Sequence, residues 1–309
     1  MKKIIVSLAA LFAAAAMMSA QSMAEATETA KLANESLSAG EYATALAGFK
    51  EALKMAEACG DEGLELVATC KDIIPKTMNA MAKEELKENR FDEAIAMFQE
   101  TIALAKEYGD EELAKKAEDL IPQIYMKKGG ALLNAKDYAG AADVYAKALE
   151  VEPTNGVAAL RMGMALEGAE KAEEAIEAYK TAAANGQEKN ANSQLGKLYL
   201  KRSVASLKAK KYADAVKDAV TSNEFAPNAQ ALQVAGQASQ LAGKNADAIK
   251  YFEQYLEAAP DAKNAGQVAY TVGALYQQSK NNAKAKEFFS KAVNDPKYGP
   301  DAQKALKAL

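Results

Sequence analysis

The 309-residue sequence contains no histidine, which removes the commonest general base at neutral pH and the imidazole ligand of metal sites. It also lacks the glycine-rich and nucleophile-elbow motifs of P-loop proteins, dinucleotide-binding domains and α/β-hydrolases. Its many carboxylates stand near lysines on predicted helix faces, as Glu111 does beside Lys115, which is typical of solvated ion pairs. We therefore expect a protein that is not an enzyme and that uses no metal and no cofactor.

Cysteine is nearly absent as well, since only Cys59 and Cys70 occur. Cys59 ends one predicted helix, and Cys70 lies about two turns into the next, beyond the turn at Gly60. Their Cα atoms should then be roughly 10 Å or more apart, beyond the limit of about 7 Å for a disulfide. We expect two buried thiols, with Cys70 as a small packing residue in the place of Ala117. The alternative, a disulfide, would show as a mass shift of two hydrogens on reduction.

Glycine and proline are scarce, with 18 and 7 residues, and aromatic residues make up only 7% of the chain. This composition, rich in alanine, favours helices nearly throughout. The formal charge of −4 is mildly acidic, and nucleic-acid binding requires a cationic surface. We therefore expect no nucleic-acid partner.

The first 24 residues resemble a signal peptide in their order of charged, apolar and small residues. Lys2 and Lys3 precede an apolar run over 4–18, which as a helix would span roughly 22 Å of a hydrocarbon core about 30 Å thick. We expect cleavage after Ala24, although cleavage after Ala20 or an uncleaved membrane anchor are alternatives. Cleavage would leave no transmembrane anchor and would place the protein in a bacterial periplasm or at the cell surface.

A triplet of small, large and small residues recurs along the chain at spacings of four and three, which places its members on one helix face. The two small residues let a neighbouring helix approach, and the aromatic residue fills the space between turns. The clearest copy is Ala141, Tyr145 and Ala148. The other copies are Ala45, Phe49 and Ala52; Ala94, Phe98 and Thr101; Ala175, Tyr179 and Ala182; Ala248 and Phe252; Ala285, Phe289 and Ala292; and a degenerate copy at Ala215 and Ala219.

This pattern resembles the tetratricopeptide repeat (TPR) family, whose helix pairs recur every 34 residues. The step from Ala141 to Ala175 is 34, whereas the other steps between first alanines run from 33 to 49. The resemblance covers roughly residues 26–309 and implies an all-α fold, a right-handed α-α superhelix of about seven helix-turn-helix repeats. It also implies a concave groove that commonly binds peptides. Some members of the family bind a terminal carboxylate with lysine and asparagine residues at set positions in consecutive repeats. This sequence has Asn34 at one such position, but Ala30 replaces the lysine and no later repeat supplies the set, so this activity is not implied.

The predicted solenoid spans residues 25–299, and its repeats differ in their connections. Repeats one and two are longer than the others and contain a Gly-Asp-Glu segment at residues 60–62 and 109–111, respectively. We expect extended helices in these two repeats. The polar stretch 185–190 is a candidate for a soft joint, or alternatively for a domain boundary. Residues 300–309 are expected to form a helix that caps the last repeat.

Two surfaces are candidates for partner binding. Between residues 197 and 211 there are six cations and no acid, and four of the lysines fall within about 80° on a helix. These form a candidate patch for an anionic partner: Lys197, Lys201, Lys208 and Lys211. Ordinary solvated lysines are the alternative interpretation.

The second surface is a glutamine-rich stripe in repeats six and seven, expected on the groove-facing side. Its residues are Gln230, Gln233, Gln237, Gln240, Gln267, Tyr270 and Gln277. An amide both donates and accepts hydrogen bonds, which suits an extended peptide segment. A polar groove that only stays hydrated is the alternative.

Two function hypotheses follow. The preferred one is an exported, non-catalytic TPR scaffold that binds proteins or peptides in the cell envelope through its concave groove. The alternative is a carbohydrate-binding module that serves polysaccharide capture, with a glycan as partner. The scarcity of aromatic residues favours the first, because sugar sites generally use exposed rings for stacking.

Overall fold

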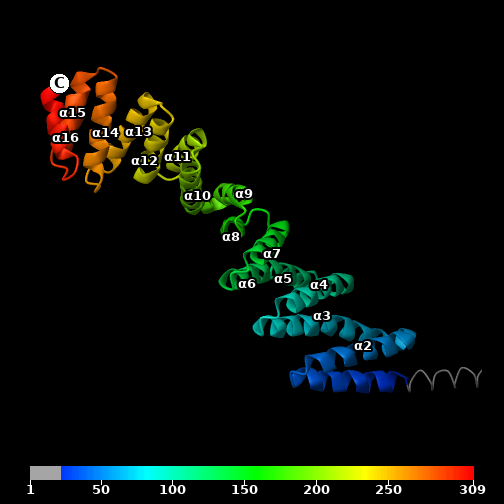
Figure 1. Cartoon of the computed structure of the whole chain (residues 1–309). Coiled ribbons are helices and arrows are strands. Elements are labelled where there is room, and N and C mark those ends of the chain that lie inside the picture. Colours follow the sequence, from blue (N-terminus) through cyan, green and yellow to red (C-terminus); the bar gives the residue numbers. More distant parts are fainter. Residues whose placement is uncertain (1–21) are drawn as a thin grey trace, which may run out of the picture. The chain divides into compact units, whose positions relative to one another are not determined.

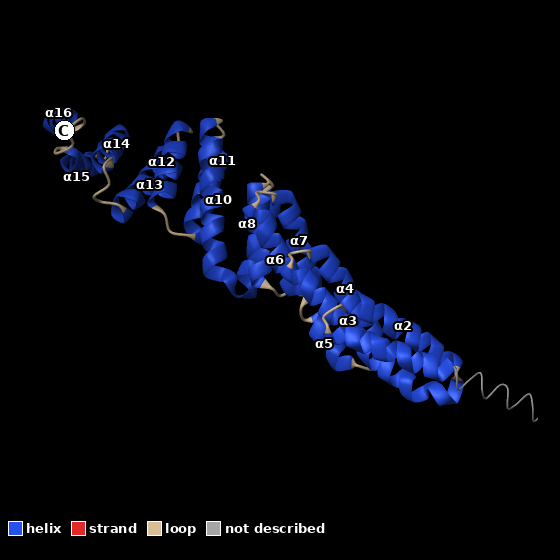
Figure 2. Ribbon diagram, turned by 90° about the horizontal axis from the view of Figure 1, so that it is seen from below, coloured by secondary structure: helices blue, strands red, loops and turns tan. Residues whose placement is uncertain are grey.

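The computed structural model describes residues 22–309, and within this range every regular element is a helix (Figure 2). The prediction of an all-α fold is confirmed. The predicted signal peptide falls almost entirely outside the described residues. The helices assemble into two compact units that divide after Pro153, and each unit is described separately below.

The first unit begins with a helix over residues 22–38 and continues with helices α2 to α7 (Figure 1). The helix over 22–38 packs against α2, α3 packs against α4, and α6 packs against α7, so that three helix pairs follow one another. Helix α5 is a short addition before the third pair. The bounds are α2 Tyr42–Ala58, α3 Leu64–Lys87, α4 Phe91–Tyr108, α5 Glu111–Glu118, α6 Ile121–Asn134 and α7 Tyr138–Val151.

The second unit contains four helix pairs and a final single helix. With the first unit this makes seven pairs within the described residues, as the sequence predicted. The bounds are α8 Gly156–Gly168, α9 Ala172–Ala182, α10 Glu188–Lys208, α11 Tyr212–Phe225, α12 Ala229–Leu241, α13 Asn245–Ala258, α14 Ala265–Gln278, α15 Asn282–Ala292 and α16 Gly299–Ala308.

The core of each regular pair rests on a small residue that faces an aromatic ring sixteen positions later. A Cβ built on Gly163 would lie 2.6 Å from the ring of Tyr179, and one on Gly236 would lie 2.5 Å from the ring of Phe252. Glycine therefore lets the second helix approach the first closely. The same contact joins Gly129 to Tyr145 and Gly273 to Phe289, and alanine replaces glycine in the pairs Ala33 with Phe49 and Ala82 with Phe98.

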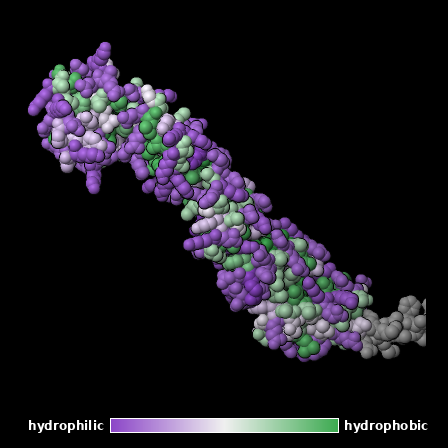
Figure 3. Space-filling model, in the orientation of Figure 1, coloured by the Kyte–Doolittle hydropathy of each residue, from purple (hydrophilic) through white to green (hydrophobic). Residues whose placement is uncertain are grey.

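Burial confirms the repeat register predicted from the sequence. The aromatic residues of the six regular copies are at most 2% exposed, and the alanines that flank them are fully buried. These side chains form the cores between helices, whereas the face shown in Figure 3 is mostly hydrophilic, with smaller apolar groups between.

Repeat five replaces the aromatic contact with polar ones. The pair that stands sixteen residues apart here is Ser203 and Ala219, and the Ser203 hydroxyl donates to the carbonyl of Ala215 at 2.8 Å. Asp218 is buried beside Arg202, with Oδ2 and Nε 3.4 Å apart; burial raises the pKa of the Asp218 carboxyl, and Arg202 opposes that shift. Hydrogen bonding thus holds α10 to α11 where ring packing holds the other pairs.

Two buried tyrosines of equivalent position differ in their hydroxyl groups. The Tyr145 hydroxyl has no hydrogen-bond partner among the described residues, whereas the Tyr179 hydroxyl donates to Glu167 at 3.1 Å. Burial and the Glu167 carboxylate raise the pKa of Tyr179, so that it stays protonated over the physiological range.

We therefore expect Tyr145→Phe and Tyr179→Phe to have different effects on stability. Tyr145→Phe removes an unsatisfied hydroxyl and should leave the free energy of unfolding unchanged or raise it by about 1 kcal/mol. Tyr179→Phe should lower it by about 1–2 kcal/mol, because a hydrogen bond to a charged group is lost. Urea denaturation of both variants measures the difference. A larger loss for Tyr145→Phe than for Tyr179→Phe would contradict this assignment.

The two inserted links of the first unit fold differently. Helix α3 runs for 24 residues and includes Pro75 in its interior, in agreement with an extended helix. In the next repeat the equivalent segment breaks at residues 119–120 into α5 and α6, so the expected single extended helix is not formed there. Pro122 lies in the first turn of α6, where the N–H that proline lacks has no helical partner in any case.

The second unit contains the polar stretch 185–190 and the C-terminal helix. Gly186 has a φ of +83°, a left-handed conformation that turns the chain between α9 and α10. The Asn185 carbonyl packs so closely on Gly156 that a Cβ there would lie 2.1 Å from its oxygen. At the other end, α16 buries Ala302 and packs Leu306 against the cluster around Phe289.

Candidate functional site

The predicted glutamines of α12 share the side of the helix that its packing leaves accessible. Asn228 caps the helix by accepting from the Gln230 backbone N–H at 2.9 Å, which fixes where the first turn begins. Gln230 and Gln240 are exposed, and Gln233 and Gln237 are partly exposed. The opposite face is apolar and buried: Ala231, Leu232, Val234, Ala235 and Ala238.

The corresponding residues of α14 differ in how exposed their side chains are. Gln267 and Gln277 are exposed. Tyr270 is half-buried, because its ring lies 5.5 Å from the rings of both Phe289 and Tyr298. Tyr270 therefore supports the C-terminal core, and its replacement by alanine should lower stability.

The predicted lysine patch is accessible but is not one helical stripe. Lys197, Lys201 and Lys208 are exposed along α10, and Lys211 is exposed in the turn that follows. The helix ends at Lys208, because Lys210 takes a left-handed conformation with a φ of 60°. The expectation that Lys211 shares the helical arc is therefore wrong.

A further cation of this segment points elsewhere. Arg202 pairs with Glu173 at 2.9 Å and lies over the ring of Tyr199, on the side of α10 that contacts α9 and α11. None of the four patch lysines forms an ion pair with another described residue. An anion would therefore meet them as separate, solvated charges.

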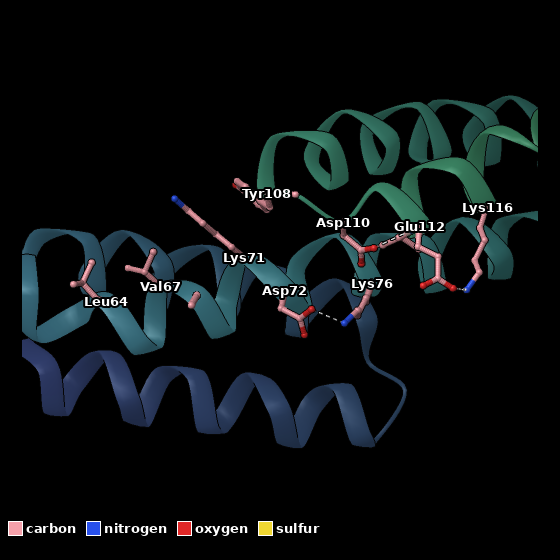
Figure 4. Close-up of a pocket in the computed structure, with 12 residues that line it drawn as sticks. Leu64, Val67, Lys71, Asp72, Lys76, Tyr108, Asp110, Glu112 and Lys116 are labelled. Carbon is pink, nitrogen blue, oxygen red and sulfur yellow. Dashed lines mark hydrogen bonds and ion pairs between the residues drawn. The ribbon is translucent and has the colours of Figure 1, made fainter.

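Sequence reasoning missed a pocket of about 790 Å³ in the first unit, built from the two inserted links (Figure 4). One wall is the N-terminal half of α3, and the other is the start of α5 with the end of α4. Leu64, 62% exposed, Val67 and Leu113 give this pocket an apolar lining. The signal in the sequence was the repeated Gly-Asp-Glu phrase, because two equivalent insertions in adjacent repeats lie beside one another.

The charged residues around this pocket already have partners. Figure 4 shows Asp72 with Lys76 and Glu112 with Lys116, and both pairs are 2.5 Å apart. Lys71 lies 3.2 Å from Glu57 and 5.5 Å from the ring centre of Tyr108, whose pKa is raised chiefly by burial. Because these charged side chains are paired with one another or with Glu57, the pocket can contact an apolar group but presents no unpaired charge to an ion.

No group of three or more Cys, Asp or Glu side chains within residues 22–309 could hold a metal ion. In the same range no helix combines the length and the apolar character needed to cross a membrane. Both cysteines are free thiols, and Cys70 is fully buried, as expected of a packing residue. The expectation that Cys59 is buried as well is wrong, because it lies at the end of α2 and is partly exposed.

Three solved structures illustrate what the chain is similar to. YrrB, described as a TPR protein with an unusual peptide-binding site, is 22% identical over 65% of this chain and 97% of its own, with a TM-score of 0.35. MamA is 19% identical over 59% of this chain and 96% of its own, with a TM-score of 0.37. PilF of Pseudomonas aeruginosa is 18% identical over 60% of this chain and 81% of its own, with a TM-score of 0.30. No curated protein matches the chain.

The chain consists of successive helix pairs, and in most of them a small residue of the first helix packs against an aromatic ring of the second. This architecture is that of the α-helical repeat proteins. One tetratricopeptide repeat model matches residues 79–156, and a second matches residues 229–262 and 266–294. The chain belongs to the tetratricopeptide repeat family.

Proposed function

We propose that this protein is an exported, non-catalytic scaffold that binds protein or peptide segments in the cell envelope through its concave groove. The observation that carries the proposal is the set of accessible glutamines on α12, together with Gln267 and Gln277 at the corresponding places of α14. Two consecutive repeats thus present amides from the first helix of each pair, the helices that line the groove in this family.

The chemistry of this surface favours an uncharged, extended segment. Each amide can donate to a carbonyl and accept from an N–H, and these groups alternate along an extended peptide. A glycan would also find hydrogen-bond partners, but the ring of Tyr270 is engaged with Phe289 and Tyr298 instead of offering a stacking surface. A peptide is therefore the ligand that we propose.

We expect Gln233→Ala, Gln237→Ala and Gln267→Ala in one variant to weaken peptide binding strongly while the melting temperature stays nearly constant. A peptide selected from a displayed random library against the full chain serves as the probe, and its affinity is measured by fluorescence anisotropy. Each lost hydrogen bond to an uncharged group should cost about 0.5–1.5 kcal/mol, so three should lower affinity by roughly one to three orders of magnitude.

The matched control replaces two exposed glutamines elsewhere in the same unit. Gln254 lies on α13 and Gln303 on α16, both exposed, and Gln254→Ala with Gln303→Ala should leave the affinity unchanged. Equal binding by the triple variant and the parent would show that the groove is not the site.

Export has its own test. We expect the protein isolated from the envelope to begin at Glu25, because Ser22-Met23-Ala24 offers small residues at the positions that a signal peptidase reads. Mass spectrometry of the intact chain measures this directly. A mature chain that retains Met1 or Lys2 would contradict both the cleavage and the export.

A further inference from the structure

A pocket of about 340 Å³ lies between repeats five and six, where α11, α12 and α13 meet. Its wall is mainly apolar, with Val216 and Val220 from α11 and two tyrosines, Tyr212 and Tyr251, at its sides. This volume is near the lower end of the range of about 300–1,000 Å³ found for ligand pockets, so it suits a compact ligand.

The pocket lies at the degenerate repeat. The buried core at this junction is made of Ala219, Val234 and Ala235, with Tyr251 packed against it. Ala219 stands where the regular copies have a tyrosine or phenylalanine. The core beside this pocket thus has an alanine where the regular repeats have a ring, with the partly buried Leu200, Val204 and Leu207 packed around it.

One buried hydroxyl group among the residues that line this pocket lacks a hydrogen-bond partner. Ser239 of α12 lines the pocket and is fully buried, and its hydroxyl has no hydrogen-bond partner among the described residues. Buried hydroxyls are nearly always hydrogen-bonded, because an unpaired one loses its bonds to water without replacement. A ligand atom that bonds to the Ser239 hydroxyl would supply the missing partner.

The rim of the pocket carries an excess of positive charge. Lys217 and Lys244 line it together with Asp247, and all three are exposed. None of the three forms an ion pair with another residue in the described part of the chain. Burial raises the pKa of Tyr251, and the nearby Asp247 carboxylate raises it further, which places this carboxylate on the Tyr251 side of the rim.

We propose that this pocket binds a small aromatic carboxylate that carries a phenolic hydroxyl. The ring occupies the space between Val216, Val220 and Tyr251, the phenol bonds to the Ser239 hydroxyl, and the carboxylate is met by Lys217 and Lys244. This ligand class goes beyond the peptide binding proposed above and does not depend on it, because the pocket is formed mainly by the second helices of the two repeats.

The test compares three probes on the full chain by isothermal titration calorimetry. The probe with both groups is 3-(4-hydroxyphenyl)propionate, while 3-phenylpropionate lacks the hydroxyl and 4-ethylphenol lacks the carboxylate. We expect each of the two reduced probes to bind about tenfold more weakly, equivalent to roughly 1.4 kcal/mol. Absence of binding by all three at millimolar concentration would overturn the proposal.

Variants assign the two ends of the ligand. Ser239→Ala should lower the affinity for the hydroxylated acid to that for 3-phenylpropionate, whose own affinity stays the same. Lys217→Gln with Lys244→Gln should weaken both acids and leave 4-ethylphenol unaffected. Lys250→Gln, an exposed lysine of α13 that does not line the pocket, is the matched control. A hydroxyl preference that survives Ser239→Ala in a chain with the parent melting temperature would disprove this assignment.

Discussion

Phe98→Ala, Tyr145→Ala and Phe289→Ala should each lower the free energy of unfolding by about 3–5 kcal/mol. Each ring is at most 1% exposed and lies in the centre of a helix pair. Burial of such a ring stabilises the fold by roughly 2–3 kcal/mol. The remaining loss comes from the void, because helices held by neighbouring repeats cannot close around it.

Thermal melting and urea denaturation measure these losses. Leu241→Ala is the matched control, since Leu241 is 60% exposed and its truncation should change stability by no more than about 0.5 kcal/mol. If all three ring variants melt with the parent protein, the repeat register described here is wrong.

Gly163→Ser and Tyr179→Ala should each destabilise the second unit, yet their combination should cost clearly less than the sum of the two. A Cβ on Gly163 would lie 2.6 Å from the Tyr179 ring, so the serine overpacks the pair by about 1–3 kcal/mol. Tyr179→Ala alone leaves a void worth about 3–5 kcal/mol. In the double variant the serine enters that void, and we expect a coupling of at least about 1 kcal/mol.

Repeat five provides the precedent for the double variant. Ser203 and Ala219 stand in the same two places, and the Ser203 hydroxyl bonds to the Ala215 carbonyl. A control substitution, Gly168→Ser, places the same residue near the exposed end of α8 and should cause no comparable loss. Strict additivity of Gly163→Ser and Tyr179→Ala would mean that the two side chains do not share one space.

The sequence by itself determined the helices, the repeat register and the residues of the core. Helical periodicity is local, so the spacing of Ala141, Tyr145 and Ala148 suffices to place all three on one buried face. The constant separation of sixteen residues is also present in the sequence, although its meaning as a glycine packed on a ring requires the paired helices. In the same way, the accessible side of α12 follows from the spacing of its glutamines.

Only the tertiary structure decided how equivalent segments differ and where space is left between them. Pro75 lies inside a continuous helix, whereas Pro122 begins a new one, and Tyr270 joins the core at α16 instead of the open surface. The pockets beside Leu64 and Ser239 follow the same rule. A cavity is the volume that side chains from several helices leave unfilled, and that volume depends on how the helices pack, which no single helix's periodicity records.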